Sequence, residues 1–147
     1  MEGRDFLFRG QSTHQAVWIE GDYVRGVYSS GRIDHRIHEC NPRAFSWFVK
    51  PETVSQYVNR TDRNGVKVFE GDILKFNATL DDGEVVEERL LVVYDDEVCG
   101  FLLCDCSRKA LNEDLPLQED FNDYEVIGNR WDNPDLICAE TRKELGI

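Results

Sequence analysis

The chain has 147 residues, of which 41% are hydrophobic and 31% are charged, and its formal net charge at pH 7 is −12. This length fits one domain, or one domain with a small annex, and the composition differs from that of disordered and membrane proteins. No apolar run approaches the roughly 20 residues that a spanning helix needs, so we expect no membrane association.

The N-terminus and the cysteines both point to a cytoplasmic protein. Charged residues occupy the start of the chain, which therefore lacks the apolar stretch of a secretory signal. The five cysteines are odd in number, and three of them lie in or beside an apolar predicted strand. A secreted chain of this size would more often pair an even set, so we expect reduced thiols.

The first 52 residues are rich in short strand patterns. Aromatic side chains alternate there with polar ones, and glycines and Pro42 separate the runs. The predicted strands cover residues 5–9, 16–19, 23–28 and 44–48. The polar segment between the last two, residues 29–41, is predicted to be a loop.

From residue 53 onward the pattern predicts a β-meander. Asn64-Gly65 lies between two β-rich runs and favours a tight turn, as does Asp82-Gly83 further along. The predicted strands cover residues 53–58, 66–69, 73–76, 89–94, 100–104 and 124–129. The continuous apolar run that follows Arg89 within residues 89–94 indicates burial on both faces. Short strands at this spacing favour a barrel or a sandwich.

A helix is predicted from about residue 134 to residue 144. Asn133 offers an N-cap, Pro134 suits the first helical position, and Asp135 lies near the positive end of the helix. Leu136, Ile137 and Leu145 are expected to pack the helix against the β-structure.

The negative charge is concentrated in the second part of the chain. Residues 1–60 carry 8 Lys and Arg against 7 Asp and Glu, whereas residues 61–147 carry 9 against 22. The acidic part would repel a phosphate backbone, so general nucleic-acid binding is disfavoured. A local basic patch in the first part, with Arg25, Arg32, Arg36 and Arg43, remains an alternative.

Histidine and cysteine side chains provide a hypothetical metal site. His35, His38 and Cys40, together with Cys104 and Cys106, contain the nitrogen and sulfur ligands that tetrahedral zinc prefers. Their spacing differs from that of common structural zinc sites, and the simpler interpretation is buried or partly exposed cysteines with solvated histidines. Whether these residues meet in space is not given by the sequence, and we predict no metal ligands.

The acidic turns are interpreted as structural. In Glu70-Gly71-Asp72, glycine suits a turn and aspartate suits bonds to nearby backbone N–H groups; Asp62-Arg63-Asn64-Gly65 has the same chemistry. The carboxylates at residues 81, 82, 84 and 95–97 are expected to be solvated. No nucleophile motif or glycine-rich phosphate loop occurs. We therefore predict no catalytic or cofactor-binding residues, no cofactor and a non-enzymatic protein.

Several ordered segments resemble the YopX family of phage and prophage proteins. They are Phe8-Arg9-Gly10, Trp18 with Gly21-Asp22-Tyr23-Val24, residues 53–58, 62–74 and 93–97, Gly100-Phe101, residues 124–129 and residues 132–136. The resemblance implies a small barrel related to SH3-like folds and a phage or prophage origin. It brings no established activity and no catalytic residues. Residues 30–43 and 107–120 depart from the family pattern.

Together these patterns predict a mainly β fold: a small, partly open SH3-like barrel with additional N-terminal strands and a short C-terminal helix. Residues 1–52 would form a strand-rich segment packed on the barrel, residues 53–133 the YopX-like barrel core, and residues 134–147 the C-terminal helix.

The leading functional hypothesis is a phage accessory protein that binds an unidentified host or phage protein. The alternatives are a nucleic-acid-binding barrel that uses the more basic first part, and an acidic DNA mimic. Open strand edges in a small barrel also favour a homo-oligomer.

Overall fold

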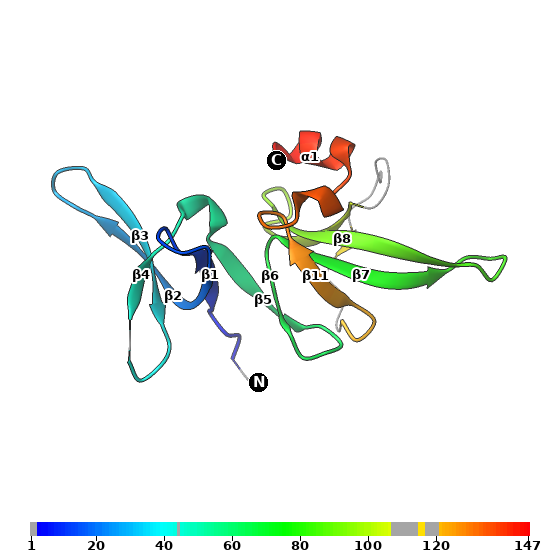
Figure 1. Ribbon diagram of the computed structural model, residues 1–147, viewed down its shortest axis with the longest axis horizontal. Helices are drawn as coiled ribbons and strands as arrows, with labels where there is room; N and C mark the ends of the chain where they lie inside the picture. Colours follow the sequence, from blue (N-terminus) through cyan, green and yellow to red (C-terminus); the bar gives the residue numbers. More distant parts are fainter. Residues whose placement is uncertain (1–2, 44, 107–114, 117–120) are drawn as a thin grey trace. The chain divides into compact units, whose positions relative to one another are not determined.

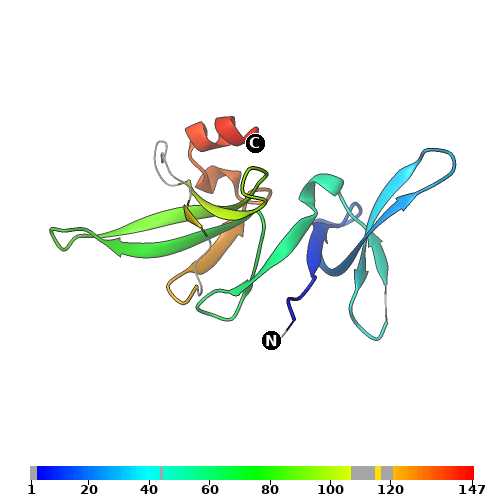
Figure 2. The ribbon, with the colours of Figure 1, turned by 180° about the vertical axis from the view of Figure 1, so that it is seen from behind.

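The structure is a computed structural model that describes residues 3–43, 45–106, 115–116 and 121–147 (Figures 1 and 2). The chain divides into two compact units, unit 1 from Met1 to Tyr57 and unit 2 from Val58 to Ile147. The strands pair antiparallel in two sheets, and neither sheet closes into a barrel over the described residues. The mainly β prediction is confirmed, whereas the SH3-like barrel stays a prediction.

Unit 1 consists of a sheet with the strand order β4-β3-β2-β1, and the first residues of β5 pair with β1. Its elements are β1 (Phe8–Gln11), β2 (Trp18–Val27), β3 (Ile33–Glu39), β4 (Ser46–Phe48), the 3-10 turn η1 (Pro51–Thr53) and the start of β5 (Ser55–Thr61). Ile19, Ile37 and Val49 form its buried core. Half-buried Trp47 packs against this core.

The predicted loop over residues 29–41 is wrong, because β3 occupies most of it. Ile37 pairs with Tyr23 of β2 and Trp47 of β4, and its side chain is completely buried. The polar neighbours of Ile37 concealed this alternation in the sequence. Strand β2 also runs without a break through Gly21, where the sequence predicted a boundary between two strands. Glycine is needed at this position because a Cβ would overlap the carbonyl group of His38.

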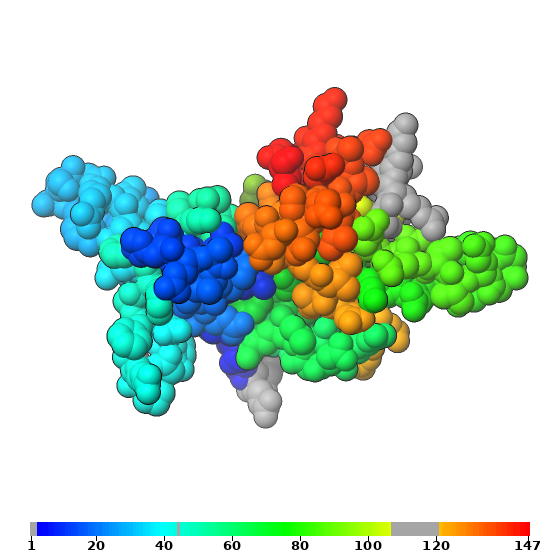
Figure 3. All heavy atoms as spheres, viewed as in Figure 1, coloured from blue at the N-terminus to red at the C-terminus, as the bar shows by residue number. Residues whose placement is uncertain are grey.

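Unit 2 contains a five-stranded sheet with the order β10-β9-β8-β7-β11, and β6 pairs with the end of β5. The bounds are β6 (Lys67–Phe69), β7 (Asp72–Thr79), β8 (Val85–Asp95), β9 (Gly100–Asp105), β10 (Leu115–Pro116) and β11 (Glu125–Asn129). The hairpin of β7 and β8 projects beyond the rest of unit 2 (Figures 1 and 3). The predicted strands at 73–76 and 89–94 were therefore too short.

The central strand β8 is buried on both of its faces, as its apolar run predicted. Leu90 and Val92 belong to a cluster that includes Phe121 and Tyr124. Leu91, between them in sequence, belongs to a second cluster. Because successive side chains of a strand point to opposite faces, the sheet separates these two clusters.

The second cluster is closed by the C-terminal segment. This segment contains the 3-10 turn η2 (Pro134–Leu136) and helix α1 (Ala139–Leu145), so the predicted helix is interrupted. Ile137 and Cys138 between the two are extended, and the Cys138 N–H donates to the Cys106 carbonyl at 2.9 Å. The predicted packing of this segment is confirmed. Over the described residues, no helix combines the length and apolar character needed to cross a bilayer.

Candidate functional site

The buried carboxylate of Asp62 connects the β5–β6 turn to β11. Its Oδ1 accepts the N–H groups of Asn64 and Val66, and its Oδ2 accepts the N–H of Val126, each at 2.9 Å. Gly65 in this turn has φ +77°, a conformation that glycine adopts without strain. Asp62 is thus occupied within the fold, which supports the structural interpretation of this turn.

The Glu70-Gly71-Asp72 segment forms a tight corner against Trp131. The Asp72 carboxylate is buried and accepts the Phe69 N–H at 2.8 Å. Gly71 has φ +86°, and a Cβ on it would overlap the Trp131 ring. The Arg130 N–H donates to the Gly71 carbonyl at 2.9 Å. The corner therefore holds the fold together, as the turn chemistry predicted.

The residues of the hypothetical zinc site do not assemble within β3. His35 and His38 are separated by an odd number of positions, so they lie on opposite faces of the strand. His35 Nδ1 lies 2.6 Å from the Tyr23 hydroxyl. Cys40 is exposed. Throughout the part of the chain that the structure describes, no three His, Cys, Asp or Glu side chains gather to hold a metal ion.

The other two residues of the hypothetical zinc site, Cys104 and Cys106, belong to unit 2. Cys104 lies in β9, and Cys106 follows the strand and is completely buried in the second cluster. Burial raises the pKa of the Cys106 thiol to about 12. A neutral thiol is a poor nucleophile and a poor metal ligand, so Cys106 acts as a small apolar side chain.

The arginines of the hypothetical basic patch are divided between two faces of the β2–β3 hairpin. Arg36 Nε lies 3.3 Å from the Asp34 carboxylate, and Arg32 Nη2 lies 3.7 Å from it. Arg25 pairs with His35 and so lies on the face opposite Arg36. Arg43 lies in the turn before β4. This arrangement does not give the four arginines a common surface on one face.

Asp34 is held charged by the same cluster. The Tyr28 hydroxyl donates to Asp34 Oδ2 at 2.7 Å. This hydrogen bond, together with the charges of Arg36 and Arg32, lowers the pKa of the Asp34 carboxyl below its usual value. Gly26 lies directly across from Asp34, and a Cβ there would overlap the carboxylate oxygen.

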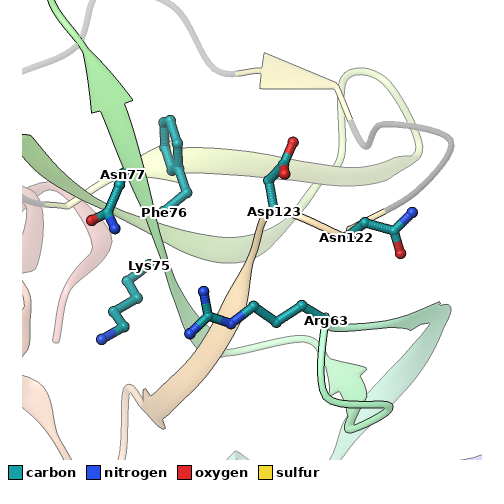
Figure 4. Close-up of a pocket in the computed structure, with 6 residues that line it drawn as sticks. All are labelled: Arg63, Lys75, Phe76, Asn77, Asn122 and Asp123. Carbon is teal, nitrogen blue, oxygen red and sulfur yellow. The ribbon is translucent and has the colours of Figure 1, made fainter. Parts of the chain in front are cut away.

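A polar pocket of about 410 Å³ lies in unit 2 where β11 begins (Figure 4). It is lined by Arg63, Lys75, Phe76, Asn77, Asn122 and Asp123. The Glu125 carboxylate forms ion pairs with two of these residues, Arg63 at 2.9 Å and Lys75 at 3.6 Å. The cations of the pocket are thus balanced by a carboxylate of the same unit.

The projecting β7–β8 hairpin carries exposed apolar and acidic side chains together. Val85 is 61% exposed and Leu80 is 39% exposed, on either side of the turn. Asp81, Asp82, Glu84, Glu87 and Glu88 belong to the same hairpin, and residues 76–88 contain no Lys, Arg or His. Asp82 Oδ1 accepts the Glu84 N–H at 2.8 Å and so shapes the turn.

Sequence reasoning missed this surface. It assigned the carboxylates to turns but ended the two strands before the apolar residues at their tips. The alternation of Ala78 with Leu80, and the pair Val85-Val86, were the available signals of longer strands.

The chain is similar to known proteins in sequence and in fold. A sequence model of one protein family, described as "YopX protein", matches residues 7–138. The crystal structure of protein EF1440 from Enterococcus faecalis is similar, with a TM-score of 0.53 and 21% sequence identity, over 91% of this chain and 99% of that chain. At this identity the likeness concerns the fold alone. No curated protein matches.

Proposed function

The chain belongs to the YopX family, and from that membership we propose that it is a phage or prophage accessory protein that binds another protein without catalysing a reaction. The observation that carries the proposal is the β7–β8 hairpin. Its exposed Leu80 and Val85 lie among five acidic residues on a projecting part of unit 2.

Apolar side chains at the end of a projecting hairpin bury little surface within their own chain. Their transfer from water into an interface would contribute about 25 cal/mol for each Å² buried. Exposed apolar groups surrounded by polar ones are typical of protein interaction sites. Leu80 and Val85 are thus the proposed apolar contacts of the interface.

The surrounding carboxylates define the charge of the partner. Uniform negative charge on the hairpin attracts a basic surface and repels an acidic one. Attraction between exposed charges weakens with salt, because the Debye length is only about 8 Å at physiological ionic strength. The proposed partner is therefore a basic host or phage protein, bound more tightly at low salt.

The test is affinity capture from host lysates at low and at physiological salt. The protein should recover a specific partner, and Leu80→Ser with Val85→Ser should lose it. Val98→Ser is the matched control, because Val98 is 59% exposed in unit 2 but lies outside the hairpin. Absence of any specific partner at low salt across several hosts would count against the proposal, as would equal losses in both variants.

A direct nucleic-acid assay separates this proposal from its alternative. Titration with single-stranded and duplex DNA at about 50 mM salt should give no binding, because the hairpin repels phosphates. Salt-sensitive DNA binding that is lost on substitution of Arg25 and Arg43 would favour the alternative. Displacement of DNA from the recovered partner would instead identify the chain as a DNA mimic.

A further inference from the structure

Strand β7 extends beyond the strand that covers its outer edge. The pairing of β11 with β7 starts at Glu125, which lies opposite Lys75. On its other side β7 stays paired with β8 as far as Thr79, opposite Val85. Among the described residues, no strand pairs with residues 76–79 on the β11 side. This stretch is an open sheet edge.

The register determines which backbone groups this edge presents. The Leu80 N–H donates to the Glu84 carbonyl at 2.8 Å at the end of the hairpin. Hydrogen-bonded and non-hydrogen-bonded pairs alternate along an antiparallel ladder. The pairs Thr79–Val85 and Asn77–Glu87 are thus non-hydrogen-bonded. The N–H and C=O groups of Thr79 and Asn77 therefore point away from β8, toward the open edge.

The pocket lies beside this edge. Lys75, Phe76 and Asn77 line it from β7, while Asn122 and Asp123 line it from the turn that precedes β11 (Figure 4). The turn carries the chain away from β7 before Glu125 joins the ladder. The edge thus borders a hollow of about 410 Å³, which leaves room for an added segment.

We infer that the open edge of β7 binds an extended, Lys- or Arg-containing segment of a partner protein, which adds to the sheet as an antiparallel strand in line with β11. The inference rests on the proposed protein-binding function and names its mode. Main-chain bonds to Asn77 and Thr79 provide the pairing, as in other cases of strand addition. The five carboxylates of the hairpin select basic side chains in the added strand.

A second copy of this chain fits the edge less well. Two β7 edges in contact would bring together two hairpins that each carry five acidic residues and no basic ones over residues 76–88. Like charges on paired strands are destabilising. The charge of the hairpin therefore favours a basic segment over self-association.

Two substitutions at Thr79 give a matched test. Thr79 is exposed, and its N–H points away from β8 toward the open edge. Thr79→Pro removes this outward N–H without breaking the β7–β8 ladder. Thr79→Val changes the side chain at the same position and keeps the N–H.

The probe is a short fluorescent peptide of alternating valine and lysine, with its valine–glutamate counterpart as the charge control. Anisotropy at low salt should show binding of the lysine peptide and at least about tenfold weaker binding of the glutamate peptide. Thr79→Pro should weaken binding about fivefold to tenfold, and Thr79→Val less than about twofold. A further test needs no protein variant. The lysine peptide should no longer bind when alternate backbone nitrogens are methylated.

Hydrogen exchange locates the binding. The amide protons of Asn77 and Thr79 should become protected when the lysine peptide is added. Equal effects of the two Thr79 variants, or binding without this protection, would overturn the inference. The inference would also be overturned if sedimentation showed a dimer of this chain that Thr79→Pro abolishes. If the lysate partner binds the Thr79→Pro protein as tightly as the parent, the edge inference fails while the proposed function stands.

Discussion

Trp131 covers Gly71 so closely that a Cβ on this glycine would overlap two carbons of the indole ring. The backbone at Gly71 also has φ +86°, which other residues adopt at a cost. The corner that precedes β7 therefore requires glycine for two independent reasons.

Gly71→Ala is expected to lower the free energy of unfolding by about 2–4 kcal/mol, from the sum of backbone strain and overpacking. Gly83→Ala is the control, because Gly83 has φ +87° but no atom within 4 Å of the added Cβ. Gly83→Ala should lower the free energy of unfolding by about 1 kcal/mol, the cost of the backbone strain alone. Urea unfolding of both variants measures the difference, and equal losses would show that the contact with Trp131 costs nothing.

Asp62→Ala removes a carboxylate that accepts three backbone N–H groups. Because these donors would lose their acceptor, the variant should lose about 1–3 kcal/mol of stability or more. Asp82→Ala, which affects one exposed turn bond, should lose less than about 1 kcal/mol. Thermal unfolding compares the two, and an Asp62→Ala protein as stable as Asp82→Ala would contradict the structural role.

Tyr28→Phe removes the largest contribution to the lowered pKa of Asp34. The pKa of Asp34 should then rise toward its usual 3.8. A carboxyl with a lowered pKa stabilises the folded chain above its ordinary pKa, and this contribution is lost as the pH falls through the folded value. Carboxyl NMR titration should show the rise in Tyr28→Phe. No rise should occur in Tyr94→Phe, a control on the separate unit.

Cys106 should resist alkylation in the folded protein, because burial keeps its pKa near 12 and excludes the reagent. Cys40 and Cys99 are exposed and should react first. The raised pKa favours folding below pH 9.0, the ordinary thiol value, and this contribution declines as the pH rises toward 12. Mass spectrometry after iodoacetamide treatment measures the order in which the cysteines are alkylated. Cys106 labelling as fast as Cys40 labelling in native protein would refute the expectation.

Local chemistry made part of the fold predictable. Asn64-Gly65 and Asp82-Gly83 gave the correct turns, since glycine at positive φ is a local requirement. Strand β3 was missed because its apolar alternation is limited to Ile33 and Ile37 among polar residues. Its pairing with β2 and β4, which lies outside any local pattern, determines the burial of Ile37.

The candidate site was less accessible to sequence reasoning than the turns. The acidity of the hairpin could be read from the sequence. An open edge, in contrast, is recognised only when the extent of one strand is compared with that of the strand paired to it. Strand β7 continues to Thr79, whereas β11 pairs with it only as far as Lys75. This difference depends on the register between segments that lie far apart in the chain. No window of the sequence contains both.

The hydrogen bond from Val126 to Asp62 joins residues 64 positions apart. During synthesis, Asp62 therefore leaves the ribosome long before its third donor is available, and unit 2 cannot complete its sheet until β11 emerges. The contacts of unit 1 lie within the first 57 residues, so this unit can fold earlier on the ribosome. We expect the nascent chain to acquire its structure in that order, with β11 closing unit 2 last.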